Sequence, residues 1–209
     1  MLRLTTMTIN IEPAKGGKLS LFADGEYIMT VDPDTWYSLD YTDGCEIDDE
    51  EFQKLKFLID SRKAYSQALR FLTLRAHSEK ELFLKLTKKH SPESSQYAIE
   101  KCRELGFVDD EDFAVRYAAE LSEKKNYGAS RIKTELYAKG ISREIAENAV
   151  LHLDFDISQA IINIIEKKYK SCLDDEKGRR RMVAGLMRYG YSYSDIRNAL
   201  RDLDLPEDC

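Results

Sequence analysis

Pairs of apolar residues recur in this chain at an interval of 50 residues. The members of each pair are four residues apart, as on one face of a helix, and a helix stop follows four residues later. The first members are Leu82, Ile132 and Met182, the second are Leu86, Leu136 and Leu186, and the stops are His90, Gly140 and Gly190. Such regularity indicates tandem helical units, each too small to bury its apolar face alone.

Helix start signals divide each 50-residue interval into three helices. Ser78 with Glu81, and Asp109 with Asp112, have the spacing of N-terminal capping residues, and a proline follows Ser91 at the first helical position. The sequence therefore predicts a mainly α fold with three tandem three-helix repeats, at residues 61–108, 109–154 and 155–209. We expect these repeats to form an elongated, curved array that suits a long partner better than a small substrate.

A short acidic segment at residues 1–60 precedes the repeats. Asp24-Gly25 favours a type I′ hairpin turn between strands at residues 18–23 and 26–31. Asp48 with Glu51 predicts the start of a long helix that runs toward Arg75, and Asp60-Ser61 is the place where this helix could break. The segment is therefore expected to be a small β-hairpin followed by helix.

The charge of the chain is concentrated in this first segment. Residues 1–60 hold 5 lysines and arginines against 13 aspartates and glutamates, whereas the remainder holds 27 against 25. The 209-residue chain carries a net charge of −6, which excludes a general coat for nucleic acid, because phosphate affinity needs clustered cations.

The remaining composition predicts a cytoplasmic protein without a membrane segment. The longest aliphatic run, near Ala160–Ile165, is too short to cross a bilayer, and no export signal is recognised. Four widely spaced cysteines are expected to be reduced thiols, at Cys45, Cys102, Cys172 and Cys209.

Three segments of the sequence resemble the RecX family. They are Arg75-Ala-His-Ser-Glu-Lys-Glu-Leu82, Gly106-Phe-Val-Asp-Asp-Glu-Asp-Phe-Ala114 and Gly128-Ala-Ser-Arg-Ile-Lys-Thr-Glu-Leu-Tyr-Ala-Lys-Gly-Ile141. The resemblance covers residues 60–205. It implies a regulator of the RecA recombinase that lodges in the groove of the RecA–DNA filament and restrains strand exchange, ATP hydrolysis and coprotease activity, with a role in DNA repair, recombination and the SOS response. The chain departs from the family pattern at His90, which replaces a glycine, and at Tyr189-Gly190-Tyr191.

Basic side chains in the repeats are the candidate partner-binding or DNA-binding residues. A solvent-exposed helix face explains the lysines of the first repeat as well as partner binding does. In the third repeat one helix face carries three cations, and a run of three arginines favours a phosphate or carboxylate partner. The candidates are Lys80, Lys85 and Lys88 in the first repeat, and Lys177, Arg179, Arg180, Arg181 and Arg188 in the third.

The middle repeat contributes Arg131, Lys133 and Lys139, and the corner before Ser78 contributes Arg75. Arg131 can instead pair with Glu135 one turn later, which would contribute only about 0.3–0.5 kcal/mol. Lys139 suits a helix C-terminus for electrostatic reasons alone, and a corner arginine often binds helix-end carbonyl groups. Both interpretations remain open for these residues.

No catalytic, metal or cofactor site is predicted. The acidic run at residues 109–112 fits the first turn of a helix, where carboxylates accept hydrogen bonds from free amides. No histidine has an evident partner for acid–base chemistry, and glycine-rich phosphate loops are missing from the sequence. The tyrosines at Tyr189, Tyr191 and Tyr193 are expected to close a hydrophobic core, although exposed rings could stack on bases.

Two functions follow from these observations. The first is a monomeric, non-enzymatic regulator that binds the RecA filament and at most weakly binds single- or double-stranded DNA. The alternative is a helical-repeat protein that acts directly on nucleic acid without RecA. The alternative predicts salt-sensitive binding to bare DNA whose log–log slope shrinks when Arg179, Arg180 and Arg181 are neutralised.

Overall fold

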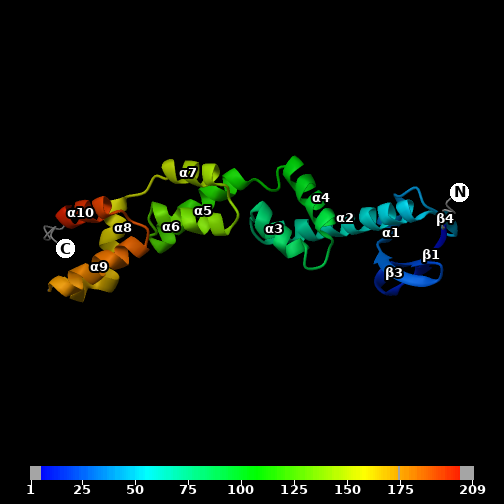
Figure 1. Cartoon of the computed structure of the whole chain (residues 1–209), viewed down its shortest axis with the longest axis horizontal. Coiled ribbons are helices and arrows are strands. Elements are labelled where there is room, and N and C mark those ends of the chain that lie inside the picture. Colours follow the sequence, from blue (N-terminus) through cyan, green and yellow to red (C-terminus); the bar gives the residue numbers. More distant parts are fainter. Residues whose placement is uncertain (1–5, 174, 203–209) are drawn as a thin grey trace. The chain divides into compact units, whose positions relative to one another are not determined.

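The computed structural model describes residues 6–173 and 175–202, which are mainly helical (Figure 1). The chain divides into two compact units. The first holds the described part of Met1–Arg75 together with Leu82–Phe107, and the second holds Ala76–Glu81 with the described residues from Val108 onward. Among the described residues, no helix is both long enough and apolar enough to span a membrane.

A four-stranded antiparallel sheet opens the first unit. Its strands are β1 (Met7–Pro13), β2 (Leu19–Ala23), β3 (Glu26–Val31) and β4 (Cys45–Ile47), in the order β3-β2-β1-β4. The hairpin between β2 and β3 is confirmed, because Asp24 and Gly25 have φ angles of 48° and 81°, as a type I′ turn requires. The sequence prediction missed β4, a three-residue strand that pairs with Met7–Ile9 of β1 at the edge of the sheet.

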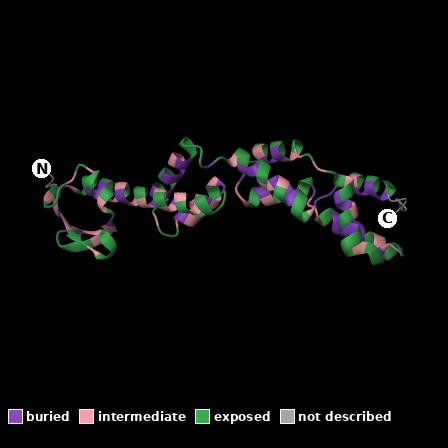
Figure 2. Cartoon of the chain, turned by 180° about the vertical axis from the view of Figure 1, so that it is seen from behind, coloured by how far each residue is buried: buried purple, intermediate pink, exposed green. Residues whose placement is uncertain are grey.

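The sheet and two helices enclose the core of the first unit. Helix α1 (Pro33–Tyr37) contributes Trp36, and α2 (Asp49–Leu74) contributes Leu55 and Ile59 against Leu21 of the sheet. The 3₁₀ turn η1 (Lys15–Gly17) joins β1 to β2. Figure 2 shows the buried residues of α2 alternating with exposed ones along the helix, as the amphipathic pattern requires.

Helix α2 continues without a break through Asp60 and Ser61, contrary to the possible break there. The Asp60 carboxylate does not bind its own helix backbone. It lies 2.6 Å from Nδ1 of His90 and accepts a hydrogen bond from the Ser91 amide at 2.9 Å. Ser61 is buried, and its hydroxyl lies 3.4 Å from that of Ser94. Because both side chains bind other segments, they do not compete with the helix hydrogen bonds.

The helices of the three repeats follow the 50-residue interval. The first repeat uses the later part of α2 with α3 (Glu79–Leu86) and α4 (Pro92–Glu104), and the second uses α5 (Asp110–Lys125), α6 (Ala129–Ala138) and α7 (Arg143–Leu151). The third uses α8 (Ile157–Ile164), the turns η2 (Ile165–Tyr169) and η3 (Lys170–Cys172), α9 (Glu176–Arg188) and α10 (Tyr193–Asp202).

The apolar pairs predicted from the interval form the repeat cores. All six side chains have 0% exposure, and so have Ala64 and Ala114 of the matching positions on α2 and α5. The capping residues are also confirmed: the Ser78 hydroxyl accepts from the Glu81 amide, and the Asp109 carboxylate accepts from the Glu111 and Asp112 amides.

The turn after α6 receives the segment that leads into α3. The Ser78 hydroxyl donates to the Lys139 carbonyl oxygen at 2.6 Å, and the Asp110 carboxylate accepts from the Glu79 amide at 2.9 Å. The Lys80 side chain lies across Gly140, so a Cβ atom on that glycine would come within 2.3 Å of the Lys80 Cδ atom. These contacts lie within the second unit.

An equivalent set of contacts recurs 50 residues later, but backbone groups form it in place of the Ser78 and Asp110 side chains. The Gly128 amide donates to the Tyr189 carbonyl oxygen at 2.8 Å, and the Ser130 amide donates to the Gly190 carbonyl oxygen at 3.2 Å. Gly190 has a φ of +96°, and a Cβ atom there would lie 2.3 Å from the Arg131 backbone nitrogen. Glycine is therefore required at this turn for both its conformation and its size.

The residues at the corresponding positions of the third and first repeats, Gly178 and His90, have different partners. Gly178, which corresponds to Gly128, faces the Cys172 carbonyl oxygen, and a Cβ atom at Gly178 would lie 2.5 Å from that oxygen. His90, which corresponds to Gly140, keeps a negative φ, and its ring contacts Asp60 and Gln67. A glycine is not needed at His90, because it has neither the left-handed conformation nor the close contact of Gly140.

Three of the four predicted thiols are free in the structure. Cys102 and Cys172 are buried and Cys45 is half-buried, and burial raises the pKa of Cys102 to about 11. A thiol with so high a pKa is a structural group and not a nucleophile at neutral pH. Cys209 lies outside the described residues.

The junction at Gly190 predicts a large loss of stability for Gly190→Ala. Gly106→Ala is the matched control, because Gly106 also has a positive φ but has no atom within 4 Å of its would-be Cβ. Both changes strain the backbone, by about 1–2 kcal/mol. Gly190→Ala should lower the free energy of unfolding by about 1–3 kcal/mol more, because the backbone at Arg131 must move. Urea unfolding followed by circular dichroism measures the difference, and equal losses would contradict the proposed close approach.

The Asp60 carboxylate predicts a pH-dependent part of the stability. Burial raises the pKa of Asp60, but hydrogen bonds from His90, the Ser91 amide and Ser94 lower it more, so the pKa lies below its usual value of 3.8. The folded state therefore prefers the carboxylate, and this contribution is complete above that usual value and lost as the pH falls below it.

Asp60→Asn should accordingly lower the free energy of unfolding by about 1–3 kcal/mol at pH 7. The difference from the unchanged protein should shrink as the pH falls below 3.8, because the Asp60 carboxylate then becomes progressively protonated. Asp40→Asn is the control, because Asp40 is exposed and should show a difference near zero at pH 7 and at pH 3. A deficit of Asp60→Asn that is as large at pH 3 as at pH 7 would contradict the role of the charge.

Candidate functional site

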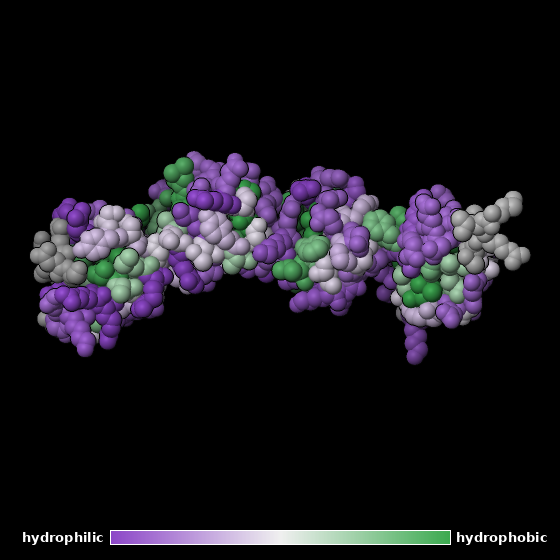
Figure 3. All heavy atoms as spheres, in the orientation of Figure 1, coloured by the Kyte–Doolittle hydropathy of each residue, from purple (hydrophilic) through white to green (hydrophobic). Residues whose placement is uncertain are grey.

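Hydrophilic residues cover most of the face seen in Figure 3, with smaller separate patches of hydrophobic residues between them. Exposure therefore does not separate binding cations from ordinary surface residues. The contacts that each candidate makes within the chain are more informative, because a cation already held by the fold is less available to a partner.

The candidates around α3 differ in this respect. Leu82 and Leu86 are buried, as predicted, whereas Lys80 and Lys88 are exposed. Lys80 is held across Gly140 by its methylene chain. The Lys85 ammonium is half-buried and lies 5.0 Å from the centre of the Phe71 ring, in cation–π geometry. Lys88 makes no ion pair with any other described residue and is the most available cation of this set.

Arg75 lies at the end of α2, at the predicted corner. It is exposed, and its amide donates to the Phe71 carbonyl oxygen at 3.4 Å. This bond closes the last turn of α2, but it belongs to the backbone and does not decide between the two interpretations of the Arg75 side chain.

The middle-repeat candidates divide into one held lysine and two more accessible cations. The Lys139 ammonium bonds to the Glu81 carboxylate and lies 5.6 Å from the Tyr117 ring centre, so it joins α3 to the turn after α6. Arg131 pairs with Glu135 at 2.7 Å, as one interpretation predicted, and its side chain keeps 44% exposure. Lys133 is half-buried on the same helix.

The arginine run of the third repeat has partners within the chain. Arg179 donates from Nη1 to the Leu173 carbonyl oxygen at 3.1 Å and is partly buried. Arg180 forms an ion pair with Glu176 one turn earlier. Arg181 donates weakly to a cysteine sulfur of η3 at 3.5 Å. The run therefore has an internal explanation, which the sequence interpretation did not foresee.

Lys177 and Arg188 bracket α9 and differ from the arginine run. Both side chains are exposed, and neither pairs with a carboxylate among residues 6–173 and 175–202. They share one helix face with Arg181, as their spacing predicted. These two cations are therefore more available to a partner than Arg179 and Arg180 of the same helix.

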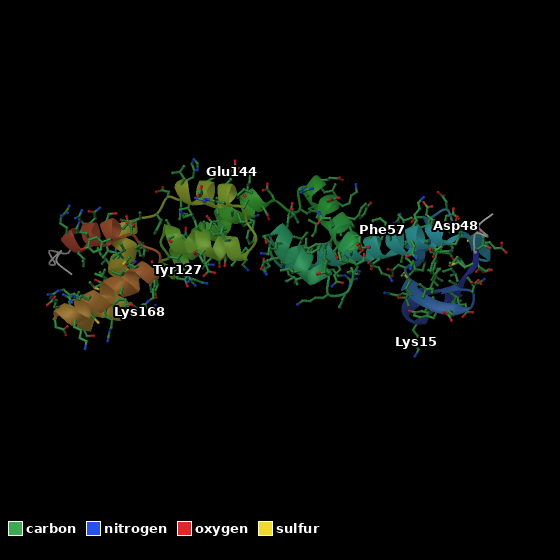
Figure 4. All side chains as sticks on the ribbon, viewed as in Figure 1. Lys15, Asp48, Phe57, Tyr127, Glu144 and Lys168 are labelled. Atoms are coloured by element: carbon green, nitrogen blue, oxygen red, sulfur yellow. The ribbon has the colours of Figure 1, made fainter. Side chains whose placement is uncertain are left out.

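The acidic run before α5 has structural roles. Asp109 caps the helix, and Asp110 accepts a hydrogen bond from the Glu79 amide. Burial raises the pKa of Asp110, and that hydrogen bond only partly offsets the effect. A cavity of about 740 Å³ lies beside the run and also reaches Glu144, labelled in Figure 4. No group of three or more metal-ligating side chains is found among the described residues.

The tyrosines of the third repeat mostly support the core, as predicted. Tyr191 is buried, donates its hydroxyl to the Asn126 carbonyl oxygen at 2.8 Å, and has a pKa raised by burial. Tyr189 packs edge-to-face on Tyr127 with ring centres 5.8 Å apart. Tyr193 is exposed at 46% and departs from the expected pattern.

One cluster of cations was not predicted from the sequence. Four lysines, Lys124, Lys125, Lys167 and Lys168, line a single pocket next to Tyr127 and Tyr189. The sequence does contain the two Lys-Lys pairs, but they are 43 residues apart and so do not follow the 50-residue interval.

Comparison with protein families accounts for all three repeats. The first, second and third three-helix domains of RecX match residues 64–102, 109–150 and 156–200, in that order. The regulatory protein RecX of Caldanaerobacter subterraneus subsp. tengcongensis is 30% identical over 193 residues, which cover 91% of this chain and 95% of that protein. The chain belongs to the RecX family. RecX is a family of regulatory proteins and not of enzymes.

Solved RecX structures have the same fold. A crystal structure of regulatory protein RecX superposes with a TM-score of 0.68 at 20% identity, over 93% of this chain and all of that one. The RecX crystal structure from Lactobacillus salivarius gives a TM-score of 0.61 at 26% identity and covers 69% of this chain. The prediction of three RecX-like helical repeats after a small β segment is thus confirmed.

The contacts in α9 predict opposite outcomes for two arginines. Arg179→Ala leaves the Leu173 carbonyl group without its donor and should lower the free energy of unfolding by about 1–3 kcal/mol. Arg188→Ala removes an exposed side chain and should change it by less than about 0.5 kcal/mol. Both free energies are obtained from urea unfolding. Equal effects would contradict the division of α9 into structural and available cations.

Proposed function

We propose that this chain regulates a RecA recombinase by binding the RecA–DNA filament and restraining its ATPase, strand-exchange and coprotease activities. The observation that carries the proposal is the match of three RecX domains in consecutive order over residues 64–200. The chain would act in the cytoplasm, as a monomer and without a cofactor, in DNA repair, recombination and the SOS response.

The proposed contacts are the available cations of the repeats. Lys88, Lys177 and Arg188 are exposed and would meet acidic protein surface or filament phosphates. Lys80, Arg131 and Lys133 would contribute from the adjoining helices. Lys139 and Arg179 would support these surfaces from within, because the fold already uses their charge.

The repeats and the N-terminal segment are proposed to act differently. Residues 61–108, 109–154 and 155–209 would each supply part of the binding surface. Residues 1–60 carry a net charge of −8 and would be repelled by DNA, so this segment would favour contacts with protein. Filament binding would then depend on many weak contacts and not on one dominant pair.

The proposal predicts that substoichiometric amounts of this protein suppress the single-stranded-DNA-dependent ATPase of RecA from the same source. Arg188→Glu should raise the concentration needed for half-inhibition by roughly fivefold, since an exposed charge contact contributes up to about 1 kcal/mol. Lys15→Glu is the control, because Lys15 is an exposed cation of η1 and its reversal changes the net charge equally.

Circular dichroism must show the same helix content for both variants. Unchanged ATPase at about a tenfold excess of the protein over RecA monomers would contradict the proposed function. Equal loss of inhibition in both variants would leave regulation of RecA in place but remove α9 as the contact surface.

A further inference from the structure

The pocket formed by Lys124, Lys125, Lys167 and Lys168 differs in charge from the cavity beside Asp109. It has a volume of about 250 Å³ and is lined by no aspartate or glutamate. Tyr127 and Lys168, labelled in Figure 4, belong to it. The cavity beside Asp109, by contrast, is lined by several carboxylates and no cation. We refer to the first as the lysine pocket.

Two irregular backbone segments bring the lysines together. Helix α5 ends at Lys125, and Asn126 takes a left-handed conformation with φ 51° and ψ 44°, which turns the chain toward Tyr127. On the other side, α8 continues into the π-helical turn η2 at Ile165–Tyr169. A π turn widens the helix and changes the direction of the side chains that follow, and such turns are frequent at functional sites.

The tyrosines of the lysine pocket are already engaged by cations. The Lys125 ammonium lies 5.7 Å from the Tyr127 ring centre, and Arg131 lies 5.5 Å from the same centre. The Lys168 ammonium lies 5.0 Å from the Tyr189 ring centre and bonds to its hydroxyl group. These contacts leave the rings less open to a stacked base, so the chemistry that the pocket offers is positive charge.

The positive charge exceeds what the fold uses. Lys124 pairs with Glu120 at 3.1 Å, but both side chains are more than half exposed, so the pair is weak. Lys125, Lys167 and Lys168 pair with no carboxylate in the described part of the chain. A helix C-terminus carries only about −0.5 charge. Two helix ends therefore neutralise a small share of four lysines, and an anion in the pocket would relieve their repulsion.

We propose that the lysine pocket binds phosphate groups of a nucleic-acid backbone. Lysine is a common phosphate ligand, which it binds as a compact point charge. All four cations that line the pocket are lysines. The lysines of this site are not among the proposed filament contacts, so the assignment goes beyond the regulatory function proposed for the whole chain.

The test is fluorescence anisotropy of a labelled oligothymidylate with the full chain, across a range of salt concentrations. The variant Lys125→Gln/Lys167→Gln/Lys168→Gln should bind about tenfold or more weakly at low salt. For this variant, the slope of the logarithm of the binding constant against the logarithm of the salt concentration should be smaller in magnitude by about 2. Each phosphate that the protein no longer neutralises reduces this magnitude by about 0.7. The control, Lys15→Gln/Lys54→Gln/Lys89→Gln, removes three exposed lysines elsewhere and should keep the affinity and slope of the unchanged protein.

A charge-preserving variant shows whether weaker binding is caused by loss of charge or by loss of folding. Lys125→Arg/Lys167→Arg/Lys168→Arg should retain binding, and circular dichroism should show unchanged helix content for all variants. Undetectable binding of the unchanged protein at low salt would overturn the proposal. Equal weakening by the pocket and control variants would overturn it as well, because general charge would then explain the binding.

Competitors identify the source of the anion. Unlabelled oligonucleotide should displace the probe, whereas pyrophosphate and polyglutamate at equal charge concentration should displace it weakly. Strong displacement by pyrophosphate would assign the pocket to small phosphate compounds, and strong displacement by polyglutamate would assign it to acidic protein. Either result would overturn the nucleic-acid assignment. RecA is absent from the assay, so its outcome does not decide the regulatory function.

Discussion

The backbone contact between two turns is the constraint on which the second unit depends. The turn at Gly190 meets the chain at Gly128–Arg131 so closely that no side chain fits between them. The equivalent contact 50 residues earlier joins Ser78 to Lys139, with a hydroxyl group in place of a backbone amide. Because each turn meets its partner at an equivalent position, the chain between successive contacts keeps nearly the same length, although the individual helices differ in length. The constant interval in the sequence is the consequence.

The sequence predicts well the features that local interactions decide. The buried pairs, the Ser78 and Asp109 caps, and the Asp24-Gly25 turn depend on residues within one or two helical turns of each other. Features that depend on distant partners were missed or wrong. Strand β4 forms only because β1 pairs with it, and α2 passes through Asp60 because His90 and Ser91 bind that carboxylate. Spacing alone does not reveal such partners.

Most internal partners of the candidate cations were missed for the same reason. The exception is the pair of Arg131 with Glu135, which lie one helical turn apart. Lys139 and Arg179 are held by the fold, whereas Lys88 and Arg188 are exposed beside them. The lysine pocket was not predicted from the sequence, because its four lysines are brought together by a π-helical turn and a left-handed asparagine. Neither irregularity follows a sequence period.

The packing at Gly178 limits the addition of a further helical repeat. In the 50-residue register this position is where the turn of a following unit would dock, as Gly190 docks on Gly128. The carbonyl group of Cys172 already fills the space. Because η3 occupies this position, the turn of a further unit would have no room to dock at Gly178 as Gly190 docks on Gly128.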